Sequence, residues 1–334
     1  MTHRKLKKEI MIGVVLLFLC VIIGSLCFVI PRFFQDKPTE KSLSKEQILV
    51  NKGITIKEKT NFIDEANSLL DKGYSPDEIN QIYEYMSDQN IEQILANNYV
   101  DLSPFYQISN FDFSKIDRYL AYQSANGLEM KDAVTRVNLN LDEPFYQTVE
   151  TITDPGSITV LVNKSHALPA DYVPEDLVNI PSFPSLQIKD DAVDDFEKLL
   201  AAAKLDNVYI IPYSTYRSYD YQNRLYTNYL GRDPKEVVDT YSARPGHSEH
   251  QTGLALDVRS SSHWDNLTDA DYEWMLNNSY KYGFIVRYPK NNSTITGYQE
   301  EPWHIRYIGV EHATKVHELG ITYDEYYDLY LTKH

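Results

Sequence analysis

The amino-acid sequence predicts an α+β domain that follows a membrane anchor and a small helical region. Three observations lead to this fold class. Residues 10–30 carry no charged side chain, residues 61–153 space their apolar side chains as helices do, and residues 154–334 mix strand-like and helix-like segments in an irregular order. An irregular order favours α+β over a regularly alternating α/β fold. With 334 residues, 43% of them hydrophobic, the chain can bury a sizeable core and is long enough for about two domains.

The first element is a predicted transmembrane helix. Residues 10–30 read IMIGVVLLFLCVIIGSLCFVI, and at ~1.5 Å per residue this run spans a hydrocarbon core of ~30 Å. The run is longer than the core of a cleaved signal peptide, and no A-x-A-like site follows it. Residues 1–9 hold four lysines and arginines, which the positive-inside rule keeps in the cytoplasm. We therefore expect a single-pass membrane protein with a cytoplasmic tail at 1–9 and residues from about 31 onward outside the cell.

The net charge argues against a nucleic-acid partner, and the positions of the cysteines argue against a disulfide outside the apolar run. The formal net charge is −16, and residues 31–334 alone carry 28 lysines and arginines against 47 acidic residues, a net −19. Such a domain repels a phosphate backbone, so we expect no nucleic-acid partner. Both cysteines, Cys20 and Cys27, lie in the apolar run, so the rest of the chain forms no disulfide.

Two segments lie between the anchor and the second domain. Residues 31–60 are polar and rich in lysine, which predicts a stalk with weak local structure at most. In residues 61–153 apolar side chains recur at helical spacing, as at Phe62 and Leu69, and Ser75-Pro76 opens a further helix. We expect short packed helices there and leave their role open.

The second domain, residues 154–334, begins at the turn DPGS. Its predicted strands lie within residues 158–164, 207–217, 253–260, 284–288 and 304–309. Its predicted helices begin after Ser218, at the capping box Thr268/Asp271, at Val310 and at the capping box Thr322/Glu325.

The stretch SEHQTGLALD, residues 248–257, carries the first candidate metal ligands. It offers His250 and Asp257, separated by a glycine turn and a short strand. Strand alternation places Asp257 and Ala255 on one face and the flanking leucines on the other. The carboxylate of Asp257 should therefore point away from the core.

A second stretch, EPWHIRY, places Glu301 three residues before His304. Pro302 biases Glu301 toward an extended conformation, unlike the helical H-E-x-x-H protease motif, which the chain lacks. Two histidines and one carboxylate form a sound catalytic zinc set, because the fourth position stays open for water. The candidate ligands are His250, Asp257 and His304.

These motifs resemble those of a known family. The pattern S-x-H-x-x-G-x-A-x-D followed by E-P-W-H, with STYRS ahead of both, is similar to the VanY-type zinc D-alanyl-D-alanine carboxypeptidases and to the related L,D-carboxypeptidases and D,D-dipeptidases. The resemblance covers roughly residues 155–320. It implies a D,D-peptidase/hedgehog-like zinc fold, in which helices flank a small antiparallel sheet.

The resemblance also implies a role for each matching residue. One zinc ion would be bound by His250, Asp257 and His304, with Glu301 as general base and Arg217 stabilising the developing oxyanion. Gln222, Ser248 and Tyr288 match positions that hold the terminal D-residue and its carboxylate. Elementary chemistry supports these roles, since zinc lowers the pKa of bound water toward ~7, where a carboxylate can take the proton. A fixed guanidinium can stabilise the charge that then develops on the carbonyl oxygen.

The favoured hypothesis is a zinc-dependent carboxypeptidase that removes the C-terminal D-alanine of peptidoglycan stem peptides. D,D activity on pentapeptides is favoured, and L,D activity on tetrapeptides uses the same residues and is the alternative. Two other classes stay open: a non-catalytic cell-wall-binding or sensor module that keeps the zinc, and an endopeptidase that cuts inside the stem peptide. A structural site needs no base and usually closes all four zinc positions, which argues against the first. The sequence leaves open the oligomeric state and the choice between wall remodelling and glycopeptide resistance.

Overall fold

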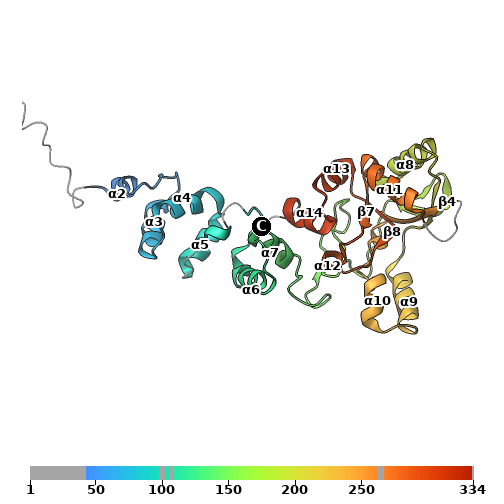
Figure 1. The fold of residues 1–334 in the computed structure, drawn as a ribbon, viewed down its shortest axis with the longest axis horizontal. Helices are drawn as coiled ribbons and strands as arrows, with labels where there is room; N and C mark the ends of the chain where they lie inside the picture. The colour runs from blue at the N-terminus through green and yellow to red at the C-terminus, as the bar shows by residue number, and fades with distance from the viewer. Residues whose placement is uncertain (1–42, 98–101, 106–107, 262–266, 333–334) are drawn as a thin grey trace, which may run out of the picture. The chain divides into compact units, whose positions relative to one another are not determined.

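The computed structural model describes residues 43–97, 102–105, 108–261 and 267–332, and the chain divides into two compact units, residues 1–106 and 107–334 (Figure 1). Within the described ranges no helix has the length and apolarity needed to cross a bilayer. The membrane span at 10–30 lies outside the described residues and stays a prediction.

The described part of the first unit is helical. Its helices are α2 (Lys45–Asn51), α3 (Phe62–Asp71), α4 (Pro76–Tyr85) and α5 (Asp88–Ala96), followed by a 3-10 turn, η3 (Ser103–Phe105). Helix α2 falls inside the predicted stalk. The side chain of Ser44 caps its first turn, and Leu49 and Ile54 are buried. These two apolar residues give the polar segment enough burial to hold a short helix.

The second unit begins earlier in the chain than the expected boundary near residue 154. The 3-10 turn η4 (Phe113–Lys115) and helices α6 (Ile116–Asn126) and α7 (Met130–Asn138) belong to it. The side-chain amide of Asn110 donates to Asp328 Oδ2 at 2.6 Å, on helix α14 (Tyr323–Tyr330). This buried hydrogen bond joins the start of the unit to its last helix.

A four-stranded antiparallel sheet forms the centre of the second unit. Its strands are β5 (Ile210–Ser214), β6 (Ala255–Ser260), β7 (Phe284–Tyr288) and β8 (Glu301–Tyr307), in the order β5-β6-β8-β7. Each lies in or overlaps a segment that the sequence predicts as a strand. The mixture of helices and a small antiparallel sheet confirms the α+β fold class.

Further elements surround this sheet (Figure 1). The helices are α8 (Val193–Leu205), α9 (Tyr219–Leu230), α10 (Lys235–Tyr241), α11 (Asp269–Asn278), α12 (Ser293–Thr296), α13 (Val310–Leu319) and α14, with 3-10 turns η5 (Asp190–Ala192), η6 (Glu249–Thr252) and η7 (Ser279–Tyr282). The remaining strands are the parallel pair β1 (Glu150–Thr151) and β2 (His166–Ala167) and the antiparallel pair β3 (Leu177–Ile180) and β4 (Phe183–Lys189). Both predicted capping boxes are present, at the starts of α11 and α14.

The main core lies on one face of the sheet. Leu199 of α8 and Met275 of α11 are fully buried there with Leu256 and Ile305 of the strands. Burying one such side chain stabilises the fold by ~1.5–3 kcal/mol. Because Leu256 faces this core, its neighbour Asp257 faces the opposite side, as strand alternation predicts.

The predicted strand at 158–164 is wrong. The segment is buried but forms no strand, because side chains from distant elements take its backbone hydrogen bonds. The carbonyls of Ile158 and Val160 accept from Arg306 Nη2 at 3.1 and 2.8 Å, and the carbonyl of Thr159 accepts from the hydroxyl of Tyr323 at 2.6 Å. Its carbonyls are thus satisfied without a neighbouring strand.

Candidate metal centre

The register of two strands brings two of the candidate ligands together. Asp257 of β6 lies directly opposite His304 of β8. Directly opposed residues have Cβ atoms ~4.5–5.5 Å apart and project from the same face. The pairing of β7 with β8 is irregular just before Tyr288, which lies opposite Glu301. Because of this irregularity, Glu301 and His304 both line the cleft although they are three residues apart.

The third candidate ligand comes from the turn that precedes β6. His250 lies in η6, which ends at Gly253 with a φ of +72°. A Cβ at that glycine would lie 2.8 Å from Leu177 Cδ2, so both the conformation and the packing require glycine. The ring of His250 is fixed by Nδ1, which lies 2.7 Å from the carbonyl oxygen of Thr215.

Three donor atoms converge on one point. Asp257 Oδ1 lies 3.3 Å from His250 Nε2 and 3.2 Å from His304 Nδ1, and the three ligand atoms all lie within 4.8 Å of one another. A tetrahedral zinc ion with ligands at ~2.0–2.1 Å requires donor atoms about 3.3–3.4 Å apart. All three residues are buried. The donor types and the two distances from Asp257 Oδ1 therefore fit zinc, and the cleft leaves room for a non-protein ligand.

Glu301 lies at the edge of this cluster. Its Oε2 is 3.8 Å from His304 Nδ1. Burial raises the pKa of Glu301 to about 7, against the opposing effects of His304 and Arg217, which lower it. A carboxyl group with a pKa close to neutral can both accept and return a proton.

Arg217 also reaches the cluster. Its guanidinium donates to Asp257 Oδ2 and, through Nε, to Ser214 Oγ at 2.9 Å, while its backbone N–H donates to the carbonyl of His250 at 3.2 Å. By engaging Oδ2, Arg217 leaves Oδ1 of Asp257 to face the two histidines. The side chain is held firmly and still lines the cleft.

The cleft has a volume of about 330 Å³, and the remaining predicted site residues line it: Gln222, Ser248 and Tyr288. The amide nitrogen of Gln222 donates to the carbonyl of Ala243 at 2.8 Å, whereas its buried Oε1 has no partner among the described residues. The resemblance implies that Gln222 helps to hold the terminal residue of the substrate. With its amide group turned this way, Gln222 offers the cleft an acceptor.

Tyr288 closes one side of the cleft. Its ring centre lies 5.1 Å from that of His304 and 5.0 Å from that of Tyr298. The side chain is almost completely buried, and burial holds the pKa of its hydroxyl well above the usual range. Tyr288 therefore stays a neutral hydrogen-bonding group beside the cluster.

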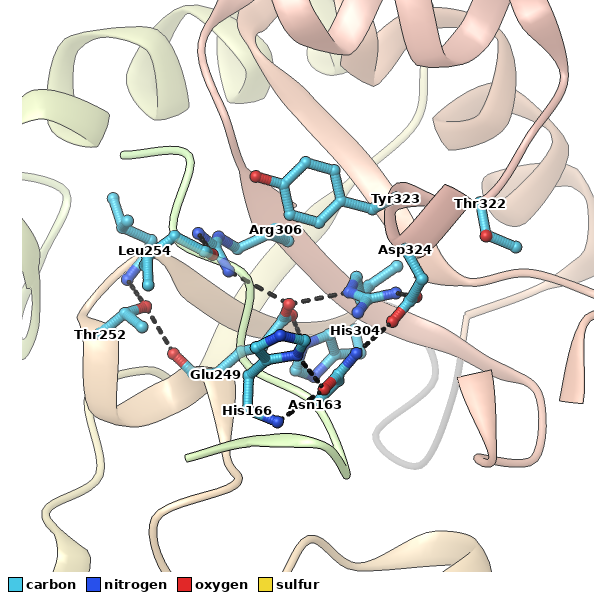
Figure 2. A network of polar contacts seen from close by, with 12 residues as sticks. Asn163, His166, Glu249, Thr252, Leu254, His304, Arg306, Thr322, Tyr323 and Asp324 are labelled. Atoms are coloured by element: carbon cyan, nitrogen blue, oxygen red, sulfur yellow. Dashed lines mark hydrogen bonds and ion pairs between the residues drawn. The ribbon is translucent and has the colours of Figure 1, made fainter. Parts of the chain in front are cut away.

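Sequence reasoning missed a buried charged network behind the cluster. It contains Glu249, Arg287, Arg306 and Asp324, and Figure 2 shows it beside His304. Two signals were available: Glu249 lies inside the motif between Ser248 and His250, and each arginine interrupts an apolar strand sequence. Charges at such positions must be paired, because burying an unpaired charge is costly.

The segment of the chain that matches known proteins includes all three candidate ligands. A family model described as VanY, D-alanyl-D-alanine carboxypeptidase, matches residues 185–310. A D-alanyl-D-alanine carboxypeptidase of Enterococcus faecalis (strain ATCC 700802 / V583) is 33% identical over 198 residues, which cover 55% of this chain and 72% of that protein.

Solved structures are also similar. The structure of the LdcB LD-carboxypeptidase matches with 39% sequence identity and a TM-score of 0.50, over 54% of this chain and 90% of that chain. A mutant of the vancomycin-resistance D,D-pentapeptidase VanY, solved in complex with Zn(II), matches with 35% identity and a TM-score of 0.45, over 50% of this chain and 97% of that chain.

Proposed function

The chain belongs to the VanY family of zinc-dependent D-alanyl-D-alanine carboxypeptidases and their relatives, and from this premise we propose that it removes the C-terminal D-alanine of peptidoglycan stem peptides. The observation that carries the proposal is the convergence of His250 Nε2, Asp257 Oδ1 and His304 Nδ1 on one point beside Glu301. A site of three ligands with a neighbouring base suits hydrolysis, because it leaves a position for water.

The side chains of the cleft supply the other parts of a peptidase. Zinc held by His250, Asp257 and His304 would polarise the scissile carbonyl and lower the pKa of water. Glu301 takes a proton from the attacking water as the new C–O bond forms. It returns that proton to the leaving nitrogen as the C–N bond breaks, which releases D-alanine with a free amine. Arg217 lies where its charge can stabilise the oxygen on which negative charge develops.

Recognition of the terminal residue is assigned to Gln222, Ser248 and Tyr288. Gln222 Oε1 is a free acceptor and suits the N–H of the terminal D-alanine. The hydroxyl groups of Ser248 and Tyr288 can donate to its carboxylate. An exopeptidase needs such donors, because a terminal carboxylate gives up strong hydration when it binds.

The proposal is tested by the release of D-alanine from a synthetic stem pentapeptide. Zinc-loaded protein should release it, a chelator should abolish release, and added zinc should restore it. Glu301→Gln should lower kcat by about 10²–10⁴-fold, the range for loss of a general base. Glu300→Gln is the matched control, because the adjacent Glu300 lies 3.7 Å from Lys290 Nζ and does not line the cleft. Equal activity of the two variants would refute the assignment of Glu301.

We propose D,D specificity first, in keeping with the description of the matching family model. The likeness to the LdcB LD-carboxypeptidase supports L,D activity as the second candidate. Comparing kcat/KM for a pentapeptide and a tetrapeptide separates the two. A preference for the pentapeptide supports D,D activity, and a preference for the tetrapeptide replaces it with L,D activity.

We also propose that residues 10–30 anchor the enzyme in the cytoplasmic membrane, with the catalytic unit outside. The support is the uncharged run of 21 residues behind a cationic tail. In spheroplasts, added protease should digest the catalytic unit while the cytoplasmic tail stays protected. Recovery of the intact chain in the soluble fraction would contradict the anchor.

A further inference from the structure

Glu249 is a buried carboxylate in contact with the metal cluster. It is 1% exposed, and its Oε2 lies 3.2 Å from His304 Nε2. Its Oε1 accepts from Arg287 Nε at 2.8 Å and from Arg306 Nη1 at 3.1 Å. Figure 2 shows Glu249 between Arg306 and the ring of His304. The sequence motifs alone do not assign Glu249 a role.

The contacts of the two histidine rings determine which nitrogen of each can bind a metal. His250 Nδ1 faces the carbonyl of Thr215, which only accepts, so Nδ1 carries the proton and Nε2 is free. His304 Nε2 faces the carboxylate of Glu249, which also only accepts when ionised, so a proton held on Nε2 leaves Nδ1 as the nitrogen that can bind a metal. The two nitrogens that this arrangement leaves for a metal, His250 Nε2 and His304 Nδ1, are the ones that lie beside Asp257 Oδ1.

A second layer of contacts fixes Glu249 itself. Arg287 Nη1 donates to Asp324 Oδ2 at 2.6 Å, and Asn163 Nδ2 donates to Asp324 Oδ1 at 2.8 Å. Glu249 and Asp324 carry two negative charges, and Arg287 and Arg306 carry two positive charges, so the buried group is neutral overall. Paired in this way, Glu249 can stay ionised and act as an acceptor.

The outer part of this network lies outside the segment that the family model matches. Asp324 belongs to α14, and Asn163 belongs to the segment before β2. The side-chain oxygen of Asn163 accepts from the backbone N–H groups of Ser165 and His166, both at 2.9 Å. Two flanking segments therefore reach the metal cluster through one chain of hydrogen bonds.

We propose that Glu249 is a positioning residue that orients His304 so that Nδ1 faces the metal, and that Arg287, Asp324 and Asn163 hold Glu249 in place. The inference rests on the proposed function, because the metal is the zinc ion of that site. Partners of this kind fix the orientation of a ligating histidine, and their loss typically lowers metal affinity or activity ~10–100-fold.

The first test is a crystal structure of the zinc-loaded full chain, purified in detergent. His304 Nδ1 and His250 Nε2 should each lie ~2.0–2.1 Å from the zinc ion, with Glu249 bonded to His304 Nε2. Coordination through His304 Nε2, or by Glu249 itself, would overturn the proposal. This result does not depend on any variant folding.

The second test measures the zinc Kd by competition with a chelator, at a temperature where every variant is folded. In Glu249→Gln, the amide can turn its NH2 group toward His304 Nε2, which favours a proton on Nδ1 and blocks the metal. The zinc Kd should rise about 10–100-fold. Glu197→Gln is the matched control, because its carboxylate bonds only to Ser182 among the contacts described and lies on α8. Equal Kd values for the two variants would contradict the proposal.

Glu249→Asp separates positioning from a purely structural role. It keeps the charge between the two arginines but withdraws the carboxylate by about one C–C bond, ~1.5 Å. A structural role predicts a Kd close to that of the wild type, whereas positioning predicts a raised Kd. If neither Glu249 variant folds, Asp324→Asn loosens the outer layer and should raise the Kd by a smaller factor. An unchanged zinc Kd in Asp324→Asn would refute the claim that Asp324 helps to hold Glu249 in place.

These measurements also separate the inference from the proposed function. The zinc Kd and the orientation of the rings are read without any peptide. A wild-type protein that binds zinc as described but releases no D-alanine would refute the proposed function alone. Active protein with an unchanged Kd in Glu249→Gln would refute this inference alone.

Discussion

Removing Arg287 should destabilise the catalytic unit severely. Its guanidinium is almost fully buried and pairs with Glu249 at 2.8 Å and with Asp324 at 2.6 Å. Arg287→Met leaves Asp324 without its arginine and Glu249 with Arg306 alone. Losing one partner of a buried ion pair lowers the free energy of unfolding by about 3–5 kcal/mol. For a unit of this size, that change lowers Tm by about 6–20 °C.

The loss of stability in Arg287→Met should be smaller in acid. Burial alone would raise the pKa of Glu249, but Arg287 and Arg306 hold it well below the usual range. In the wild type this carboxylate therefore contributes stability that is present at neutral pH and is lost as the pH falls through its low folded-state pKa. Without Arg287 its folded-state pKa rises, so the penalty in the variant is greatest at neutral pH and is relieved by protonation. The difference between the two proteins should be smaller at pH 5 than at pH 7.

The assay is thermal unfolding followed by circular dichroism in excess chelator, so that zinc binding makes no contribution. Arg232→Met is the control, because Arg232 is exposed and its loss should change stability by no more than ~0.5 kcal/mol. A second variant, Arg287→Met with Asp324→Leu, should recover part of the loss, because it removes one uncompensated carboxylate. A Tm for Arg287→Met within 2 °C of the control would refute the claim that Glu249 and Asp324 need Arg287 as a buried ion-pair partner.

Two further predictions concern other parts of the second unit. Gly283 has a φ of +78°, and a Cβ there would lie 2.5 Å from Tyr307 Cε2. Gly283→Ala should therefore lower the free energy of unfolding by at least ~1 kcal/mol, measured by urea denaturation. An unchanged denaturation midpoint would contradict this close packing. Burial lowers the pKa of Lys164 to about 8, below its unfolded-state value, so the folded protein loses this proton first and its stability should rise from pH 8 to 9.5. Lys164→Met should lack this rise by ~1 kcal/mol or more in the same denaturation series, and parallel pH curves for the two proteins would be inconsistent with the lowered pKa.

The sequence predicted best those features that local patterns determine. The capping boxes at Thr268 and Thr322 and the alternation around Asp257 depend on residues a few positions apart, and the structure confirms them. The ligand set was predicted from two motifs, and the register between β6 and β8 brings Asp257 and His304 together. Short-range patterns were sufficient because each motif forms one strand or turn.

Features that depend on distant partners were missed. The segment around Val160 looks like a strand, but Arg306, 146 residues away, takes its carbonyl. Glu249 and Arg287 are 38 residues apart, so neither residue alone indicates the ion pair. The orientation of Gln222 likewise depends on the carbonyl of Ala243, 21 residues away. Side-chain pairing over such separations is determined by the tertiary fold and leaves only a weak signal in the local sequence.

Zinc-loaded protein should remove one C-terminal D-alanine from a stem peptide. Mass spectrometry of a muropeptide pentapeptide after incubation with the full chain tests this expectation most directly, with Glu301→Gln and chelator-treated protein as controls. We expect a product that has lost a single alanine, formed by the zinc-loaded wild type and strongly reduced in both controls. Cleavage inside the peptide, or an unchanged pentapeptide despite bound zinc, would contradict it.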